Sequence, residues 1–190
     1  MQNIPAGWGD SANDAIYLAS CAAMFLDPEG ADARSFFRES WPDDKSNQSL
    51  QASQDVCYYR IYNRDDPTAN WLYSELSLDG VTQVETVPIL CQYIFYGPNA
   101  GKHASFLRTA LFREVFTARN GVEYPPPMRI LRNSGIVPLL NPAQPVRLPE
   151  LTSGVWRNRS DLTIHFNIHL ETLTETDGIQ VPPVISVIKE

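Results

Sequence analysis

The chain has 190 residues, of which 43% are hydrophobic, so it is long enough to bury a core and short enough that one domain over residues 1–190 is expected. Asp and Glu outnumber Lys and Arg by 22 to 15, and the net charge of -7 argues against a continuous basic surface and against sequence-specific nucleic-acid binding. The 15 prolines exceed the share of about 5% that is usual in proteins and predict a chain rich in loops.

The cysteines and the N-terminus point away from secretion and from membranes. Cys21, Cys57 and Cys91 are widely spaced, without a CxxC pair or a nearby histidine, and are interpreted as reduced, buried side chains. The N-terminus lacks the basic start and apolar stretch of a secretory signal, and no run of about 18 apolar residues occurs. We therefore expect a protein that is made and used in a cytoplasm.

The N-terminal part predicts one helix and a polar extension. Ser11 precedes an apolar stretch and Asp27-Pro28 supplies a stop, so we expect a short helix over residues 11–26. Residues 42–54 contain almost no large apolar side chain, which predicts a loop or a mobile surface arm. Residues 1–55 are expected to form a helical and loop extension of the single domain.

Three strands are predicted next. Residues 57–63 are rich in Tyr and Ile, and residues 71–79 end at an Asp-Gly turn signal. Residues 82–96 alternate at first and then become almost wholly apolar, which predicts a strand that moves from the rim of a sheet to a place covered on both faces. Pro88 interrupts this run and predicts an edge or a bulge.

A helix and a proline-rich segment follow. From Lys102 to Ala118 the apolar residues recur at helical spacing, which predicts an amphipathic helix closed by Asn120-Gly121. The sequence MRILRN at residues 128–133 is expected to form a short strand. Residues 135–151 contain four prolines within twelve residues, so we expect an extended apolar loop that crosses its own domain or a neighbour.

The strongest pattern is DLTIHFNIHLE at residues 161–171. Alternate positions from Leu162 to Leu170 are apolar and the positions between them are polar, which predicts a half-buried strand. The elements together predict an α+β fold, in which a mostly antiparallel sheet packs against two or so helices and carries a long proline-rich extended loop.

Candidate catalytic and ligand-binding patterns are weak, so we expect no enzyme activity, no cofactor and no metal site. His165 and His169 share the polar side of their strand, but their Cα atoms would lie about 13 Å apart, too far for one metal ion. The acidic pairs Asp43-Asp44 and Asp65-Asp66 lie in proline-flanked loops, where solvated turns are common. GPNAG at residues 97–101 lacks the lysine of a phosphate-binding loop and is explained by a tight turn.

One segment is typical of a contact between subunits. Arg157 and Arg159 flank Asn158 beside Trp156, which indicates either a solvated strand start or an interface, because Trp and Arg are enriched at interfaces. Local basic clusters such as Arg129 with Arg132 could likewise meet an acidic partner. The interface candidates are Trp156, Arg157 and Arg159, with Pro138, Leu139, Leu140 and Pro142 from the proline-rich loop.

The order of the elements is informative as a whole. It runs from YYRIYN through QYIFYGPNA, FLRTALFREVF and GIVPLLNPAQPVRLPEL to GVWRNRSDLTIHFNIHLE, over about residues 56–171. In that order the chain resembles the neck or tail-terminator (tail-completion) proteins of tailed bacteriophages. The most specific piece is the stretch that contains Trp156, Arg159, Asp161 and Leu162. Residues 1–55 lie outside the resemblance.

The resemblance implies a structural virion protein of the neck, assembled in the host cytoplasm. Its copies would form a homo-oligomeric ring, often a hexamer, that caps the head-proximal end of the tail tube and joins it to the head connector or adaptor protein. DNA would pass through the channel without specific binding, and an acidic balance would suit such a channel because like charges repel. The alternatives are another head-completion, connector or injection-particle subunit, a module that binds a host protein, and a small hydrolase that uses the acidic loops.

Overall fold

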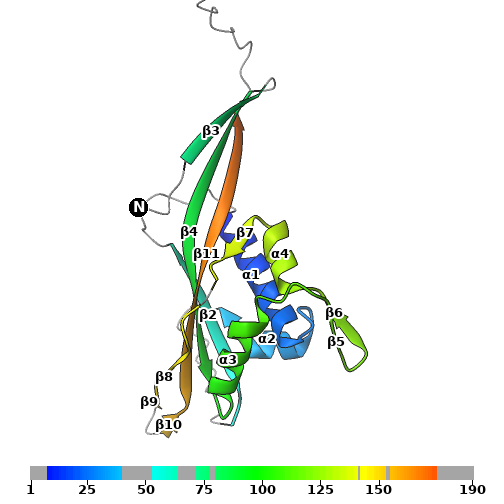
Figure 1. The fold of residues 1–190 in the computed structure, drawn as a ribbon. Coiled ribbons are helices and arrows are strands. Elements are labelled where there is room, and N and C mark those ends of the chain that lie inside the picture. Colours follow the sequence, from blue (N-terminus) through cyan, green and yellow to red (C-terminus); the bar gives the residue numbers. More distant parts are fainter. Residues whose placement is uncertain are drawn as a thin grey trace, which may run out of the picture.

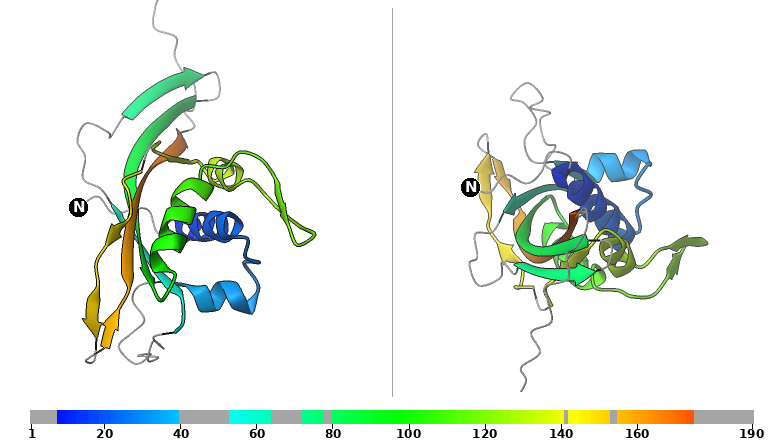
Figure 2. Two further views of the ribbon diagram at one scale, coloured as in Figure 1. Left: turned by 60° about the horizontal axis from the view of Figure 1, so that its bottom comes forward. Right: turned by 90° about the horizontal axis from the view of Figure 1, so that it is seen from above.

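The computed structural model describes residues 8–39, 53–63, 72–77, 80–140, 142–152 and 155–174. In these residues a long, curved, mostly antiparallel sheet carries four helices on one side (Figures 1 and 2), which confirms the predicted α+β class. The helices are α1 (Trp8–Met24), α2 (Ala31–Phe36), α3 (Ala100–Ala110) and α4 (Pro127–Asn133). The strands are β1 (Phe37–Glu39), β2 (Val56–Asn63), β3 (Leu72–Ser77), β4 (Gly80–Tyr96), β5 (Thr117–Arg119), β6 (Val122–Tyr124), β7 (Ile136–Pro138), β8 (Val146–Arg147), β9 (Glu150–Thr152), β10 (Val155–Arg157) and β11 (Arg159–Thr174).

The centre of the sheet is the antiparallel pair of β4 and β11. Their register runs without interruption from Arg159 opposite Tyr96 to Thr174 opposite Val81. The strand order is β1-β2-β4-β11-β7, with β3 also on β4 and β8 also on β11; β1 joins β2 in parallel. The strand predicted at residues 161–171 is therefore confirmed and is longer at both ends.

Pro88 lies at a local edge inside β4. On one side of β4, β2 ends where Asn63 faces Ile89, and β3 begins where Leu72 faces Glu85. Among the described residues no strand faces Thr86 to Pro88 from that side. A residue without an N–H group is tolerated where a sheet has an edge, so the proline does not break the strand.

The core lies between the sheet and the helices. Alternate residues of β4 and β11 are buried there: Ile89, Cys91, Tyr93, Phe95, Leu162, Ile164, Phe166 and Ile168. The residues between them, such as Leu90 and Ile94, are partly buried, so the strand predicted to be covered on both faces is fully buried on one face and partly covered on the other. Each fully buried aliphatic or aromatic side chain contributes about 1.5–3 kcal/mol.

Helix α1 belongs to this core. Ile16, Ala19 and Ala23 are fully buried, and Ser20 places its Oγ 2.9 Å from the hydroxyl of Tyr93 in β4. The small residues of α1 allow the helix to approach the sheet closely. Most of the loop predicted at residues 42–54 and the pairs Asp43-Asp44 and Asp65-Asp66 lie outside the described residues.

Two predicted elements were wrong. Residues 128–133 form helix α4, because Pro127 has the fixed φ that suits a first helical residue and Met128 and Leu131 fall on one buried face. Helix α3 ends at Ala110 instead of Ala118. Asn120 and Gly121 have positive φ angles of 52° and 77° and turn β5 into β6, as Asn-Gly does in tight hairpins.

The proline-rich segment is extended, as predicted, and crosses its own domain. β7 and β8 both pair with the free edge of β11, where Pro138 faces Phe166 and Val146 faces Asp161. In the described residues no helix is long and apolar enough to cross a membrane.

Candidate assembly surface

The proline-rich segment is fixed to the body by backbone hydrogen bonds. The N–H of Leu139 donates to the carbonyl of His165 at 2.8 Å, and the N–H of Leu148 donates to the carbonyl of Arg159 at 3.0 Å. Between these points Arg108 of α3 donates its Nε to the carbonyls of Pro142 at 2.9 Å and Ala143 at 3.2 Å. The proline-rich segment is thus tied to β11 at both ends and to α3 at residues 142 and 143.

A charged cluster fixes the hairpin that follows. The guanidinium of Arg159 donates to both carboxylate oxygens of Asp161, at 2.8 and 2.7 Å, and to Glu150 at 3.0 Å. The hydroxyl of Tyr96 also donates to Glu150, at 2.7 Å. These contacts join β9, β11 and the end of β4, and two-pronged contacts of this kind are stronger than single ones.

The pKa values reflect this cluster. The hydrogen bond to Asp161 raises the pKa of Arg159, although partial burial opposes it, and Glu150 adds to the rise. Burial, followed by the hydrogen bond to Glu150, raises the pKa of Tyr96 to about 12. Arg159 therefore stays charged and Tyr96 stays neutral in any ordinary buffer.

A third carboxylate organises the turn at the end of β4. Asp55 accepts hydrogen bonds from the backbone N–H and the side-chain amide of Asn99, both at 2.9 Å, and lies 3.4 Å from Nε2 of His103. Burial alone would raise the pKa of Asp55, but these bonds outweigh it and hold the pKa below its usual value. Gly97 has a φ of 113°, and a Cβ there would come within 2.4 Å of Asp55. GPNAG is thus a tight turn, as predicted. The carboxylate of Asp55 accepts the backbone N–H of Asn99 just before α3, where an anion would otherwise bind.

We call Asp55, Glu150, Asp161, Arg159 and Tyr96 together the carboxylate joint. It connects three parts of the structure at one end of the sheet: the start of α3, the end of β4 and the β9–β10 hairpin. The N–H of Gly97 further donates to the carbonyl of Asn158 at 3.2 Å, which ties the two parts of the joint.

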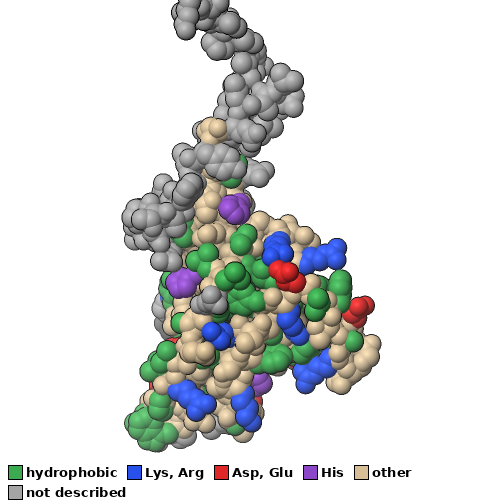
Figure 3. All heavy atoms as spheres, in the orientation of Figure 1, with side chains coloured by type: hydrophobic (Ala, Val, Ile, Leu, Met, Phe, Trp, Pro, Cys, Tyr) green, Lys and Arg blue, Asp and Glu red, His purple; other side chains and the backbone are tan. Residues whose placement is uncertain are grey.

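The joint presents an exposed apolar surface. Trp156 is 70% exposed and faces Leu151, which is 55% exposed, across the β9–β10 hairpin. Val146 and Leu148 are also exposed, and apolar side chains gather at this end of the molecule in Figure 3. An exposed Trp on a fixed hairpin is typical of a protein contact site.

The predicted interface residues divide into two groups. Trp156, Leu139 and Leu140 are exposed and Arg157 is partly exposed. The others act within the chain: Pro138 is buried, the carbonyl of Pro142 binds Arg108, and Arg159 binds two carboxylates. Sequence reasoning missed Val146, Leu148 and Leu151, although the Ser-Gly signal at residues 153–154 predicts a turn that would pair Leu151 with Trp156.

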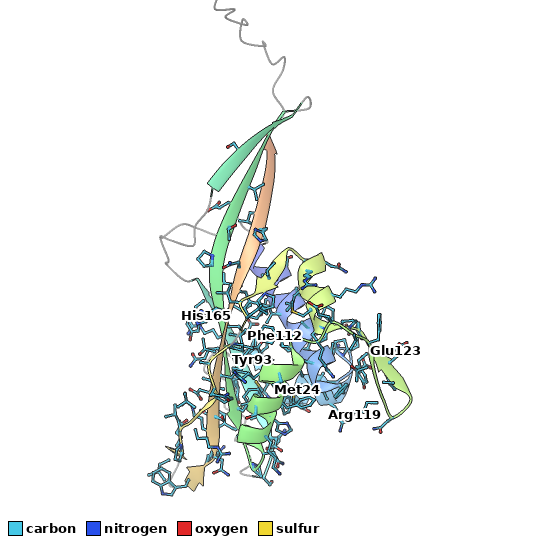
Figure 4. All side chains as sticks on the ribbon, viewed as in Figure 1. Met24, Tyr93, Phe112, Arg119, Glu123 and His165 are labelled. Carbon is cyan, nitrogen blue, oxygen red and sulfur yellow. The ribbon has the colours of Figure 1, made fainter. Side chains whose placement is uncertain are left out.

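The two histidines of β11 lie four positions apart on the strand. His165 lies on the side of the sheet away from the helices (Figure 4), and Nδ1 of His169 lies 3.1 Å from the hydroxyl of Thr86. In the part of the chain that the structure describes, no group of three or more His, Cys, Asp or Glu could hold a metal ion.

The charges of the chain are unevenly distributed. Residues 98–160 contain nine Lys or Arg and three Asp or Glu, a net charge of +6. The remaining residues contain six Lys or Arg and nineteen Asp or Glu, a net charge of -13. Among the residues that Figure 3 draws in colour, Lys and Arg are more prominent than Asp and Glu on this face. The overall charge of -7 therefore conceals a basic region.

Comparison with protein families gives a match over most of the chain. Residues 34–189 match a family model that is described as phage neck terminator protein. The match begins within residues 1–55, the segment that the sequence resemblance left outside. A search of curated proteins finds no match.

Proposed function

The chain belongs to the phage neck terminator family, and we propose that its copies form a ring that caps the tail tube and joins it to the head connector. The protein is a structural component of the virion neck. We expect six copies in the ring, DNA that passes through the channel without specific binding, and a role that involves no catalysis.

The observation that carries this proposal is the Trp156 hairpin. A side chain with this much exposed apolar area is costly in a protein that works alone, whereas burial in a contact stabilises an assembly. The carboxylate joint holds the hairpin in place before assembly, so little conformational entropy is lost when it binds. The exposed Leu151, which faces Trp156 across the hairpin, extends the same surface.

The mass of the purified protein in solution, followed by imaging of single particles, tests the proposal. We expect closed rings of one size for the wild type. Trp156→Ala should weaken the ring by more than tenfold, because a central Trp at an interface commonly contributes about 2 kcal/mol or more. Leu18→Ala, a change at an exposed position of α1, is the matched control.

Tails made without the protein distinguish a terminator from other neck subunits. A terminator predicts tail tubes of uncontrolled length in its absence. Tubes of normal length that fail to join heads would indicate a head-completion or connector subunit instead. A strict monomer at high protein concentration, together with normal tails in its absence, would contradict the proposal.

A further inference from the structure

A pocket lies at the base of the β9–β10 hairpin. Its volume is about 280 Å³, and its walls come from the start of α3, from the proline-rich segment and from the junction of β10 with β11. The polar side chains among its lining residues are Lys102, Arg147, Asn158 and Arg159, and the rest are prolines and small residues. No Asp or Glu is among the described residues that line it, so the pocket is basic.

Two of these cations are not neutralised within the described part of the chain. Arg159 is bound to Asp161 and Glu150, whereas Lys102 and Arg147 form no ion pair with a described residue. Both are exposed. A Cβ added to Gly101 would come within 3.2 Å of the Nε of Arg147, so the guanidinium of Arg147 lies directly against the first turn of α3.

The first turn of α3 is an unfavourable place for two cations. The N-terminus of a helix carries a partial positive charge, which repels a cation and attracts an anion. Helix α3 has no acidic residue in its first turn, and the carboxylate of Asp55 is already engaged by Asn99 and His103. Lys102 and Arg147 thus concentrate positive charge beside a pocket that is large enough for a carboxylate or a phosphate group.

A buried hydroxyl next to the pocket also lacks a partner. Ser160 is 1% exposed, and its Oγ has no hydrogen-bond partner among the described residues. Ser160 pairs with Arg147, and directly opposite residues of antiparallel strands point to the same face of a sheet. Buried hydroxyls in folded proteins are usually hydrogen-bonded. A free donor beside two free cations is typical of a site that completes its polar contacts when an anion binds.

The surroundings of the pocket indicate where the anion comes from. Pro149 immediately precedes β9 and Asn158 immediately follows β10, so the pocket is continuous with the Trp156 hairpin. In Figure 3, Lys and Arg side chains lie close to the apolar side chains at this end of the molecule. A protein that covers Trp156 would also cover these cations, and a cation buried without a partner is costly.

We propose that the pocket binds a carboxylate side chain of the protein that covers the Trp156 hairpin, which is the neighbouring copy in the proposed ring. The inference rests on the proposed function and names the chemistry that the contact requires. A DNA phosphate fits the site less well, because Trp156 and Leu151 gain from an apolar protein surface and not from phosphates. DNA binding also uses a row of cations, whereas only Lys102 and Arg147 are free here.

Carbodiimide cross-linking tests the contact directly, because this reagent joins a lysine amine to a carboxylate that lies against it. Lys102 is the one lysine among the described residues, and the chain has two others, Lys45 and Lys189. In assembled rings we expect Lys102 to be joined to an Asp or Glu of another copy. Rings of mixed isotope-labelled and unlabelled copies distinguish this link from one within a chain by mass spectrometry. Lys102→Arg keeps the charge, so it should remove the link and leave the ring assembled.

Charge reversal tests whether the contact stabilises the ring. Arg147→Glu should raise the protein concentration at which the ring dissociates by about tenfold or more, because a repelling carboxylate replaces an attracting cation. Arg147→Gln should have a smaller effect, since it only removes the attraction. Arg129→Glu, at an exposed position of α4, is the matched control and should leave the ring unchanged. Thermal unfolding of each variant verifies that it folds.

The outcomes separate this inference from the proposed function. Rings that dissociate in Arg147→Glu, with Lys102 linked to a carboxylate of another copy, support the contact. Rings that persist in Arg147→Glu, with Lys102 linked only within its own chain or to another virion protein, overturn the contact and leave the ring standing. Rings in which Lys102 forms no link, together with weaker DNA binding by Arg147→Glu than by the wild type, indicate a phosphate occupant and also overturn it. A wild type that forms no ring under any condition overturns both proposals.

Discussion

The two projecting hairpins of this chain are held by different chemistry. The β9–β10 hairpin is fixed by the carboxylate joint, in which charged groups pair at distances of 2.7 to 3.0 Å. The other is the β5–β6 hairpin, which we call the arm together with its flanking residues (residues 112–126). The arm is fixed by aromatic rings and guanidinium groups around Phe25, with backbone carbonyls of α1 as hydrogen-bond acceptors. In both cases, contacts with the rest of the domain stabilise a short hairpin that would not be stable alone.

This difference predicts different sensitivities. Charged pairs lose their partner on protonation or substitution, and a carboxylate left partly buried is costly. Contacts of an aromatic ring with arginine do not depend on pH in the accessible range. The carboxylate joint should therefore lose stability in acid and when one of its charged side chains is removed. The attachment of the arm should instead weaken when the aromatic ring of Phe25 is removed.

Removal of the central cation should have the largest effect. Arg159→Ala leaves Asp161 and Glu150 without their partner, and we expect a loss of about 2–4 kcal/mol in the free energy of unfolding. Arg147→Ala is the control, because Arg147 is exposed and forms no ion pair with a described residue, and it should change stability by less than about 0.5 kcal/mol. Chemical denaturation at neutral pH measures both, and equal effects would show that Arg159 does not hold the joint.

Replacement of Asp55, the carboxylate at the turn after β4, should have a smaller effect on the free energy of unfolding, and that effect should depend on pH. Asp55→Asn keeps the shape but weakens the bonds to Asn99, with an expected loss of about 1–2 kcal/mol at neutral pH. The pKa of Asp55 is lower in the folded chain than its ordinary value of 3.8, so its contribution is present above that value and is lost as the pH falls below it. The difference in stability between wild type and variant should therefore shrink from pH 5 towards pH 2. A constant difference across this range would mean that the charge of Asp55 is unimportant.

The sequence predicted the sheet better than the attachments of its hairpins. The alternation in residues 161–171 specifies which side of β11 is buried, because the side-chain period of a strand is two and each apolar residue must face the core. The proline-rich segment was predicted as extended for a local reason, the fixed φ of proline. These patterns need no knowledge of distant residues.

The joint and the arm depend on residues far apart in the chain. Asp55 meets Asn99, and Phe25 meets Arg113 and Tyr124, through contacts that only the folded chain creates. The arm was also hidden by an ambiguous signal, because Asn-Gly follows helices as well as strands. Trp156 was predicted as an interface candidate because Trp and Arg are enriched at interfaces. The role of Arg159 depends on Glu150 and Asp161, which only the folded chain brings to it.

The ring of Phe25 gives the last and smallest effect on stability. Phe25→Leu keeps an apolar side chain but removes the face on which Arg113 and Arg119 lie, so we expect a loss of about 1 kcal/mol. The arm should loosen more than the body, since its other contacts are few. Trypsin should then cut after Arg119 several times faster than in the wild type, and cutting elsewhere should change little. Leu18→Ala on the exposed side of α1 is the control. Uniformly faster cutting would indicate that Phe25 stabilises the whole domain, and the arm would then not be an independently attached unit.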